Sequence, residues 1–351
     1  MSQTATLPQV TTSIESEQTQ TSKRGERISL TLRFATDDEI SHWDDNVHAN
    51  SPGCGSFLQS AAFARTKERF GWTLRYLVYE GKNRKLYALA LERSTLTLGR
   101  LWYITGLPIR DDEMSEKLLR AIVTANKKAL SLAPTLFMIK LEILLTTTDA
   151  RLKLVKRLGL QKTSNIQSNS STVMLDVSGS PESLIDTIAY RGRRCIRVSQ
   201  RRNLETRKLE PTLETQRTMY ELMKSVNGGK GAMMIRPFKY YQHFWTQFVS
   251  EGQGHFYGVY EDGRLVTTAF VIVYGDSATY KDGGSTPRRD QTAMHAYGLQ
   301  WHIIQDLNQL GVRHYDLCGT PPSSRITDRS HPYYGLGLFK TSFNKQVLDR
   351  L

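Results

Sequence analysis

Long apolar runs and closely spaced cysteines are what this sequence lacks. Its three cysteines, Cys54, Cys195 and Cys318, are far apart and show no metal-binding spacing. Such sparse use of cysteine is typical of a reducing compartment. No run approaches the ~18 apolar residues of a membrane-spanning helix, and the first residues show neither the basic nor the apolar region of a signal peptide. We therefore expect a cytoplasmic protein.

Several motifs of common enzyme classes are absent too. The eight histidines form no HExxH pattern and no pair four residues apart. The chain contains neither GxSxG nor GxxxxGK[ST], which argues against an α/β-hydrolase elbow and a P-loop. The cysteines have no partner residues nearby in sequence, and we expect them to act as small hydrophobes.

Acidic residues are fewer than basic ones. The 351 residues contain 34 Asp and Glu against 47 Lys and Arg, a net charge of +13. Such a surface favours a polyanionic partner, which includes nucleic acid, nucleotide phosphates and an anionic membrane face. From charge alone, a basic protein with no nucleic-acid role is an equally open interpretation. The length predicts two domains.

The hydrophobic pattern predicts two halves of similar plan. Residues 1–28 are rich in Ser, Thr and Gln, and we expect them to form a disordered tail. After them, helices, an antiparallel set of strands, a helix and a strand follow in that order, twice. The expected strands are 28–34, 74–79, 86–92, 98–105, 136–144, 172–177, 256–261, 265–274, 277–282 and 314–317. The expected long helices are 61–69, 115–132, 213–226, 238–250 and 292–310. This repetition predicts a duplicated α+β chain.

Two segments combine a basic residue with a helix start. Leu58-Gln59-Ser60 precedes a helix that carries Phe63 and Lys67. A lysine is a compact charge suited to a diphosphate, although a solvated lysine on an amphipathic helix is the simpler alternative. The segment from Arg236 to Tyr240 starts another helix, where an arginine can hold a phosphate bidentately. An ordinary helix entry with proline in its first turn remains the alternative there.

The last 75 residues or so contain the most informative series. Tyr280-Lys281-Asp282-Gly283-Gly284-Ser285 is expected to be a strand that ends in a tight Gly-Gly loop, where backbone N–H groups can approach a ligand closely. The segment 311–319 follows, and then Gly335-Leu336-Gly337-Leu338-Phe339-Lys340. Taken in order with the two helix starts, these segments resemble the FemABX family, the peptidoglycan-bridge aminoacyltransferases.

The resemblance covers about residues 30–345 and implies a fold. It implies two GNAT-like (acetyltransferase-type) domains in tandem, with mixed or antiparallel sheets flanked by helices. The first domain would comprise residues 29–166 together with a returning tail, 335–351. The second would comprise residues 167–334.

The resemblance also implies roles for single residues. Lys67, Arg236, Tyr240 and Tyr280 match positions that bind the muramyl-peptide precursor, the first two through its phosphates. Phe339-Lys340 matches the closing pair that lies where the two substrates meet, and a cation there could stabilise the oxyanion formed when an amine attacks an aminoacyl ester.

A partial match adds a carboxylate. Gly106-Leu107-Pro108-Ile109-Arg110-Asp111 resembles the family's Gly-Pro-x-x-Asp loop, with Leu107 inserted. Asp111 could orient or deprotonate the attacking amine. A simple turn aspartate remains open as the other interpretation.

An arginine-rich run, 191–202, corresponds to a basic helix of the family. Arg194, Arg197 and Arg201 fall on one helical face, which fits a tRNA backbone. A solvated basic helix, or one that faces anionic lipid, remains the alternative.

The predicted function is transfer of an amino acid from aminoacyl-tRNA to an amine of the peptidoglycan stem peptide. The acceptor would be lipid-linked or UDP-linked, and the enzyme would need no metal or organic cofactor. We expect it in the cytoplasm, with peripheral contact at the inner membrane face as a further option. Two rivals stay open. An acetyl-CoA-dependent N-acyltransferase would need a glycine-containing pyrophosphate loop that 287–293 lacks, and a non-catalytic RNA-binding protein would not need Lys340.

Overall fold

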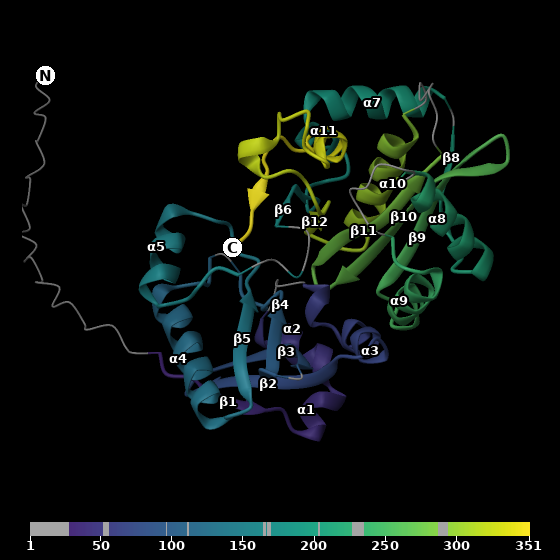
Figure 1. Ribbon diagram of the computed structural model, residues 1–351. Coiled ribbons are helices and arrows are strands. Elements are labelled where there is room, and N and C mark those ends of the chain that lie inside the picture. Colours follow the sequence, from purple (N-terminus) through teal and green to yellow (C-terminus); the bar gives the residue numbers. More distant parts are fainter. Residues whose placement is uncertain are drawn as a thin grey trace, which may run out of the picture.

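The computed structural model describes residues 28–51, 56–95, 97–110, 112–163, 166, 170–202, 204–226, 235–286 and 294–351. The expected disordered tail, 1–28, lies outside the described residues except for Ile28. The described chain forms two halves, which Figure 1 shows one above the other.

The first half contains one strand, a group of helices, three consecutive strands, and then a helix, a strand and a helix. Its elements are β1 (Thr31–Phe34), α1 (Asp37–Ser41), α2 (Trp43–Asn50), η1 (Phe57–Gln59), α3 (Ala61–Arg69), β2 (Thr73–Gly81), β3 (Arg84–Thr95), β4 (Gly99–Thr105), α4 (Glu116–Leu132), β5 (Leu136–Glu142) and α5 (Asp149–Arg157).

The second half and the closing segment follow. Their elements are β6 (Ser171–Thr172), β7 (Met174–Asp176), α6 (Leu184–Thr187), α7 (Tyr190–Arg201), β8 (Glu205–Leu209), α8 (Leu213–Val226), α9 (Phe238–Ser250), β9 (Gly254–Glu261), β10 (Arg264–Tyr274), β11 (Ser277–Ser285), α10 (His295–Gln309), β12 (His314–Asp316), η2 (Ser323–Arg325), α11 (Tyr334–Lys340) and β13 (Leu348–Asp349).

The two large sheets repeat one topology. The first has the order β1-β2-β3-β4-β5, and the second has β8-β9-β10-β11-β12 with β7 added beside β12. In both sheets the first four strands are antiparallel neighbours. The last two, β4 with β5 and β11 with β12, are parallel and are joined by a helix, α4 or α10, as a parallel crossover requires. The predicted α+β class and the duplication are confirmed.

Successive side chains along each strand point to opposite faces of the sheet, so each large sheet is covered by helices on both faces. In β2, Leu77 and Tyr79 point to the face covered by α4, whereas Val78 points to the opposite face. In β10, Phe270 lies on the inner face and Val271 on the face covered by α10. Helices α2, α3, α8 and α9 therefore contribute to the apolar core on the facing sides of the two sheets, and Figure 1 shows α3 and α9 where the two halves meet.

This apolar core, which we call the middle layer, is shared by both halves. Phe57 of the first half meets Phe248 of the second with ring centroids 5.8 Å apart, and α3 packs on α9. The Asp44 carboxylate accepts hydrogen bonds from the Ala61 amide at 2.9 Å and from the Tyr274 hydroxyl at 3.0 Å. Because burial of aromatic surface is strongly favourable, this core holds the two halves together.

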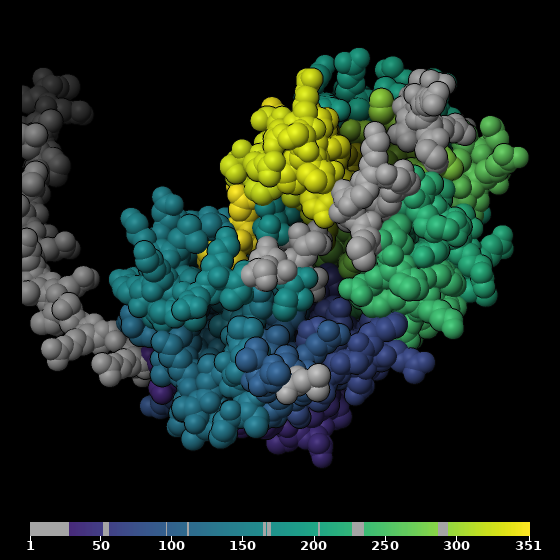
Figure 2. All heavy atoms as spheres, in the orientation of Figure 1, coloured from purple at the N-terminus to yellow at the C-terminus, as the bar shows by residue number. Residues whose placement is uncertain are grey.

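The closing segment contacts both halves. Phe339 and Phe343 pack on Tyr297 of α10, with ring centroids 5.0 and 5.6 Å away. Farther on, β13 pairs with β6, and the Leu351 amide donates to the Leu145 carbonyl at 3.0 Å. Figure 2 shows this segment, in yellow, extending from the second half down to the first. The domain boundaries inferred from the resemblance stay a prediction.

Several details differ from the expected elements. The expected strand 172–177 is divided into β6 and β7, which lie in different sheets, and β13 was not expected. Strand β8 and helix α11 were not expected, since each is short and has no clear apolar period. The segment with Gly283 and Gly284 is not a loop, because β11 continues to Ser285. A Cβ at Gly284 would overlap the backbone of α8 at Met223, so glycine allows that helix to lie close. Among the described helices, none is long and apolar enough to cross a bilayer.

Candidate functional site

The segment before α3 is built to place Lys67. Gln59 is fully buried, and its amide donates to the Thr105 carbonyl while its oxygen accepts from the Leu89 amide. Ser60 caps α3 by accepting from the Phe63 amide at 3.1 Å. Phe63 then packs in the middle layer. Lys67, one turn farther on, lies at the boundary between the halves.

Lys67 and Arg236 come from different halves and meet at Tyr240. The Lys67 ammonium lies 3.5 Å from the Tyr240 hydroxyl and 4.8 Å from the centroid of the Phe63 ring. The Arg236 guanidinium stacks 4.6 Å from the centroid of the Tyr240 ring. Arg236 is exposed and Lys67 is half-buried. The structure thus brings together three residues that the sequence proposed as a phosphate-binding set.

No carboxylate among the described residues compensates the positive charge at this place. Neither Lys67 nor Arg236 has an ion pair with a carboxylate of the described chain. Burial, together with the charges of Arg236, Lys281 and Arg93, lowers the pKa of Lys67 to about 8. Cations that repel one another are stabilised when an anion binds among them, so the set is suited to an anionic ligand.

Lys340 occupies a gap in the second sheet. β11 pairs with β12 only over Ser277–Thr279 and then separates from it. The Lys340 ammonium donates to the carbonyls of Cys318 and Gly319, just after β12, at 2.6 and 2.8 Å. It also lies 5.9 Å from the centroid of the Tyr280 ring on β11. The side chain of Lys340 therefore fills the space between the separated strands.

Lys340 is almost completely buried, with 5% of its surface exposed. Burial lowers its pKa to about 8, although Cys318 and Asp316 oppose this. Its two carbonyl acceptors leave one N–H for another acceptor. An ammonium in such a dry place interacts strongly with a developing negative charge.

An unusual backbone turn presents these carbonyls. Cys318 has a φ of +60°, in the left-handed region that non-glycine residues rarely adopt. Its amide donates to the Asp316 carboxylate at 2.7 Å, which holds the turn. Burial raises the pKa of the Cys318 thiol, so the thiol stays protonated. The contribution of this residue to the site is its carbonyl group.

Lys281 links the two groups of residues. It is the extra residue of a β-bulge in β11, and its ammonium lies 3.3 Å from the Asp282 carboxylate. Burial alone lowers the pKa of Lys281, but the charge of Asp282 raises it above its ordinary value. The Trp245 indole N–H also donates to Asp282, at 3.0 Å. Lys281 is therefore neutralised in place, unlike Lys67.

Glu142, at the end of β5, is a half-buried carboxylate that the sequence did not single out. The Tyr103 and Thr105 hydroxyls both donate to its Oε2 atom, the latter at 3.0 Å. Burial raises the pKa of Glu142 to about 7. The only available signal was a glutamate at the end of a strand that was predicted to be buried, and that pattern is common.

The arginines proposed for tRNA lie on α7. Arg194, Arg197 and Arg201 are all exposed, and their spacing places them on one face. None of the three forms an ion pair within the described part of the protein. This face is therefore open to a polyanion.

Two other predicted features lie outside the described residues. Asp111, the proposed orienting carboxylate, is one of them, and the segment 287–293, in which the acetyl-CoA alternative would need a pyrophosphate loop, is the other. In the ranges that are described, no three His, Cys, Asp or Glu side chains gather in a way that could hold a metal ion.

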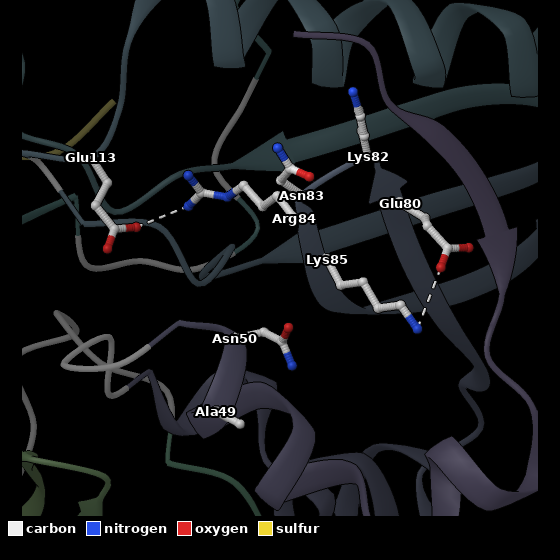
Figure 3. Close-up of a pocket in the computed structure, with 9 residues that line it drawn as sticks. Ala49, Asn50, Glu80, Lys82, Asn83, Arg84, Lys85 and Glu113 are labelled. Carbon is white, nitrogen blue, oxygen red and sulfur yellow. Dashed lines mark hydrogen bonds and ion pairs between the residues drawn. The ribbon is translucent and has the colours of Figure 1, made fainter.

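A polar hollow of about 600 Å³ lies on the first half, at the β2–β3 turn. Figure 3 shows two ion pairs among the residues that line it: Arg84 with Glu113 at 2.9 Å, and Lys85 with Glu80 at 3.3 Å. Lys67, Arg236 and Tyr240, which we call the basic set, do not line it.

Residues 189–325 match the family model described as an acetyltransferase (GNAT) domain. The crystal structure of FemX is similar over 91% of this chain and 95% of its own, with 16% identity and a TM-score of 0.70. The chain has the fold of FemX. Among curated proteins, no sequence match was found.

A second solved structure is similar as well. It is a conserved protein of unknown function from Bacteroides thetaiotaomicron VPI-5482, with 11% identity and a TM-score of 0.52, covering 92% of this chain and 98% of that one. The predicted tandem GNAT-like fold is confirmed, and the resemblance to the FemABX family is confirmed at the level of the fold. The part that matches the acetyltransferase model contains α7, Tyr240, Tyr280 and the gap beside β12.

Proposed function

We propose that this protein is an aminoacyltransferase that moves an amino acid from aminoacyl-tRNA to the stem-peptide amine of a peptidoglycan precursor. The fold and the acetyltransferase-domain match support acyl transfer as the class of reaction. The observation that carries the finer proposal is the buried ammonium of Lys340 in the gap beside β12, on the half that also contributes Arg236 and Tyr240 to the basic set.

The basic set would hold the acceptor. Lys67 and Arg236 would bind the diphosphate of a lipid-linked or UDP-linked muramyl peptide, the lysine as a point charge and the arginine bidentately. Tyr240 would orient both cations, and Tyr280 would line the path toward Lys340. Lys67 comes from the first half and Arg236 from the second, so a bound acceptor would bridge the two halves.

Lys340 would act on the reacting ester. When the amine attacks the carbonyl carbon of the aminoacyl ester, negative charge develops on the carbonyl oxygen, and the free N–H of Lys340 would stabilise it. Phe339 would keep Lys340 in place through its packing on Tyr297. Asp111 remains a proposed orienting carboxylate for the amine.

The donor would bind along the second half. Arg194, Arg197 and Arg201 would neutralise phosphates of the tRNA. Because the tRNA ester is already activated, the protein's task is to hold both substrates together and stabilise charge. We propose a cytoplasmic location, with peripheral contact at the inner membrane face when the acceptor is lipid-linked.

The test is a transfer assay with purified protein. The protein is incubated with tRNA charged with labelled Gly, Ala and Ser, and with lipid-linked or UDP-linked muramyl pentapeptide. We expect label on one acceptor, its loss in Lys340→Ala and its retention in Lys345→Ala, which changes an exposed lysine nearby.

Other outcomes would contradict the proposal. Binding of tRNA without any transfer would favour an RNA-binding protein. Acetylation of an amine from labelled acetyl-CoA, without transfer from tRNA, would favour the acetyl-CoA-dependent alternative.

A further inference from the structure

We infer that Glu142 is a catalytic residue of this site and takes the proton from the acceptor amine as that amine attacks the ester. This inference rests on the proposed function and names a proton acceptor within it. It starts from the position of Glu142 at the end of β5, where the first sheet faces the middle layer.

The side chain of Glu142 lies on the inner face of the first sheet. Thr105 is its register partner on β4, and the hydroxyl of Tyr103, two residues earlier, reaches the same carboxylate. Tyr103 belongs to the apolar core of the middle layer, so the carboxylate points to the same face.

The same face leads to the basic set. The Tyr103 ring lies 6.5 Å from the Trp72 ring, and the Arg93 guanidinium stacks 4.4 Å from Trp72. The charge of Arg93 in turn lowers the pKa of Lys67. An acceptor whose phosphates bind Lys67 thus lies along the sheet face that ends at Glu142.

The end of β5 also adjoins the Lys340 gap. The Arg350 guanidinium donates to the carbonyl of Leu144, two residues after Glu142, and lies 3.8 Å from the Asp316 carboxylate at the end of β12. Asp316 holds the turn whose carbonyls bind Lys340. Arg350 therefore joins the end of β5, which carries Glu142, to the end of β12, beside which the Lys340 ammonium lies.

One oxygen of Glu142 is left for a ligand. Tyr103 and Thr105 both donate to Oε2, whereas Oε1 accepts no hydrogen bond from any residue of the described chain. A carboxylate needs a free oxygen to receive a proton, and its ideal pKa lies near the working pH. Burial sets the pKa of Glu142 at about 7, which meets that condition.

Among the described residues, the charged and titratable groups around Glu142 are few. Tyr103 faces it from β4, and Lys140 precedes it on the same strand face, with its ammonium 2.7 Å from the Thr163 hydroxyl. Arg350 approaches from the closing segment, with its guanidinium turned to Leu144 and Asp316. None of these cations forms an ion pair with Glu142 in the part of the chain that the structure describes.

The proton and electron balance is simple. The nitrogen lone pair of the neutral amine forms the new C–N bond, and the carbonyl π pair moves to the oxygen beside Lys340. Glu142 takes the proton that the nitrogen then carries. The C–O bond to the tRNA ribose breaks, the ribose oxygen takes a proton from solvent, and Glu142 returns its proton to solvent.

The experiment measures the transfer rate of wild type and Glu142→Gln against pH, with saturating acceptor and donor. In wild type, we expect kcat to rise with pH through about 7, as Glu142 ionises, and to fall above about 8, as Lys340 loses its charge. We expect Glu142→Gln to lower kcat by about 100-fold or more. This variant should lose the rise of kcat near pH 7, the lower limb of the pH profile, and keep the fall above about pH 8, the upper limb. The matched control, Asp149→Asn at an exposed position on α5, keeps both limbs.

A second variant keeps the inference testable if Glu142→Gln folds poorly. Tyr103→Phe removes a hydrogen bond that stabilises the charged carboxylate, so the lower limb should move to higher pH. Full transfer by Glu142→Gln, or an unmoved limb in Tyr103→Phe, would overturn the inference alone. No transfer by wild type to any acceptor would overturn the proposed function and this inference together.

Discussion

The two parallel strand pairs of this molecule occupy the same place in their sheets, but they stay together over different lengths. β4 and β5 remain partners until Thr105 and Glu142, where β5 ends. β11 and β12 are partners only over Ser277–Thr279, after which they separate. The duplication has therefore kept the topology and changed the pairing.

Each of the two large sheets has an opening between two of its strands, and a different kind of side chain fills each opening. In the first sheet, β3 and β4 separate before Ala90, and the neutral amide of Gln59 bonds both edges. In the second sheet, the charged ammonium of Lys340 fills the gap beside β12. A neutral amide with all its partners stabilises a fold, whereas a buried charge with one free N–H is suited to chemistry.

The largest effect should follow from removing the charge in the second half. Lys340→Ala should lower kcat by about 100- to 1000-fold, because it removes the donor to the developing oxyanion. The measurement is the single-turnover rate of amino-acid transfer, with circular dichroism to verify the fold. If Lys340→Ala retains the wild-type rate, the gap beside β12 is not the reaction centre.

The corresponding change in the first half should affect stability instead. Gln59→Ala should lower the free energy of unfolding by about 2–4 kcal/mol, because the Leu89 amide and the Thr105 carbonyl lose their partner. Chemical denaturation measures it, with Gln200→Ala on the exposed face of α7 as control. An unchanged unfolding midpoint would show that Gln59 does not hold the first sheet together.

Removing Lys67 or Arg236, the two cations that come from different halves, should weaken acceptor binding. Lys67→Ala and Arg236→Ala should each raise the KM for the muramyl-peptide acceptor by about 10- to 100-fold, because each removes a charged hydrogen bond. The KM for aminoacyl-tRNA should stay the same. Lys239→Ala, an exposed neighbour on α9, is the control. Equal increases in KM for both substrates would contradict an acceptor-specific role.

The smallest effects should come from α7, on the outer side of the second half. Replacing Arg194, Arg197 or Arg201 by alanine should weaken tRNA binding modestly and reduce the salt dependence of log K by about 1 for each phosphate that the variant no longer neutralises. Binding is measured by fluorescence anisotropy at several salt concentrations. An unchanged salt slope in the triple variant would place the tRNA elsewhere.

The sequence by itself determined the long helices, most of the strands and the motifs that contain the candidate site residues. Apolar periodicity located the strands and long helices because it depends only on neighbouring residues. The order of the motifs indicated the tandem fold and named Lys67, Arg236, Tyr240, Tyr280 and Lys340. Short elements such as β8 and α11 have too few residues to show a period.

Only the tertiary structure decided which of these groups meet and what their charges do. Lys67 and Arg236 lie far apart in the chain, and the shared middle layer brings both to Tyr240. Glu142 became noticeable only through its burial, which raises its pKa, and Lys340 through the two carbonyls that it binds. Periodicity is a local property of the chain, whereas desolvation and convergence depend on packing between distant segments.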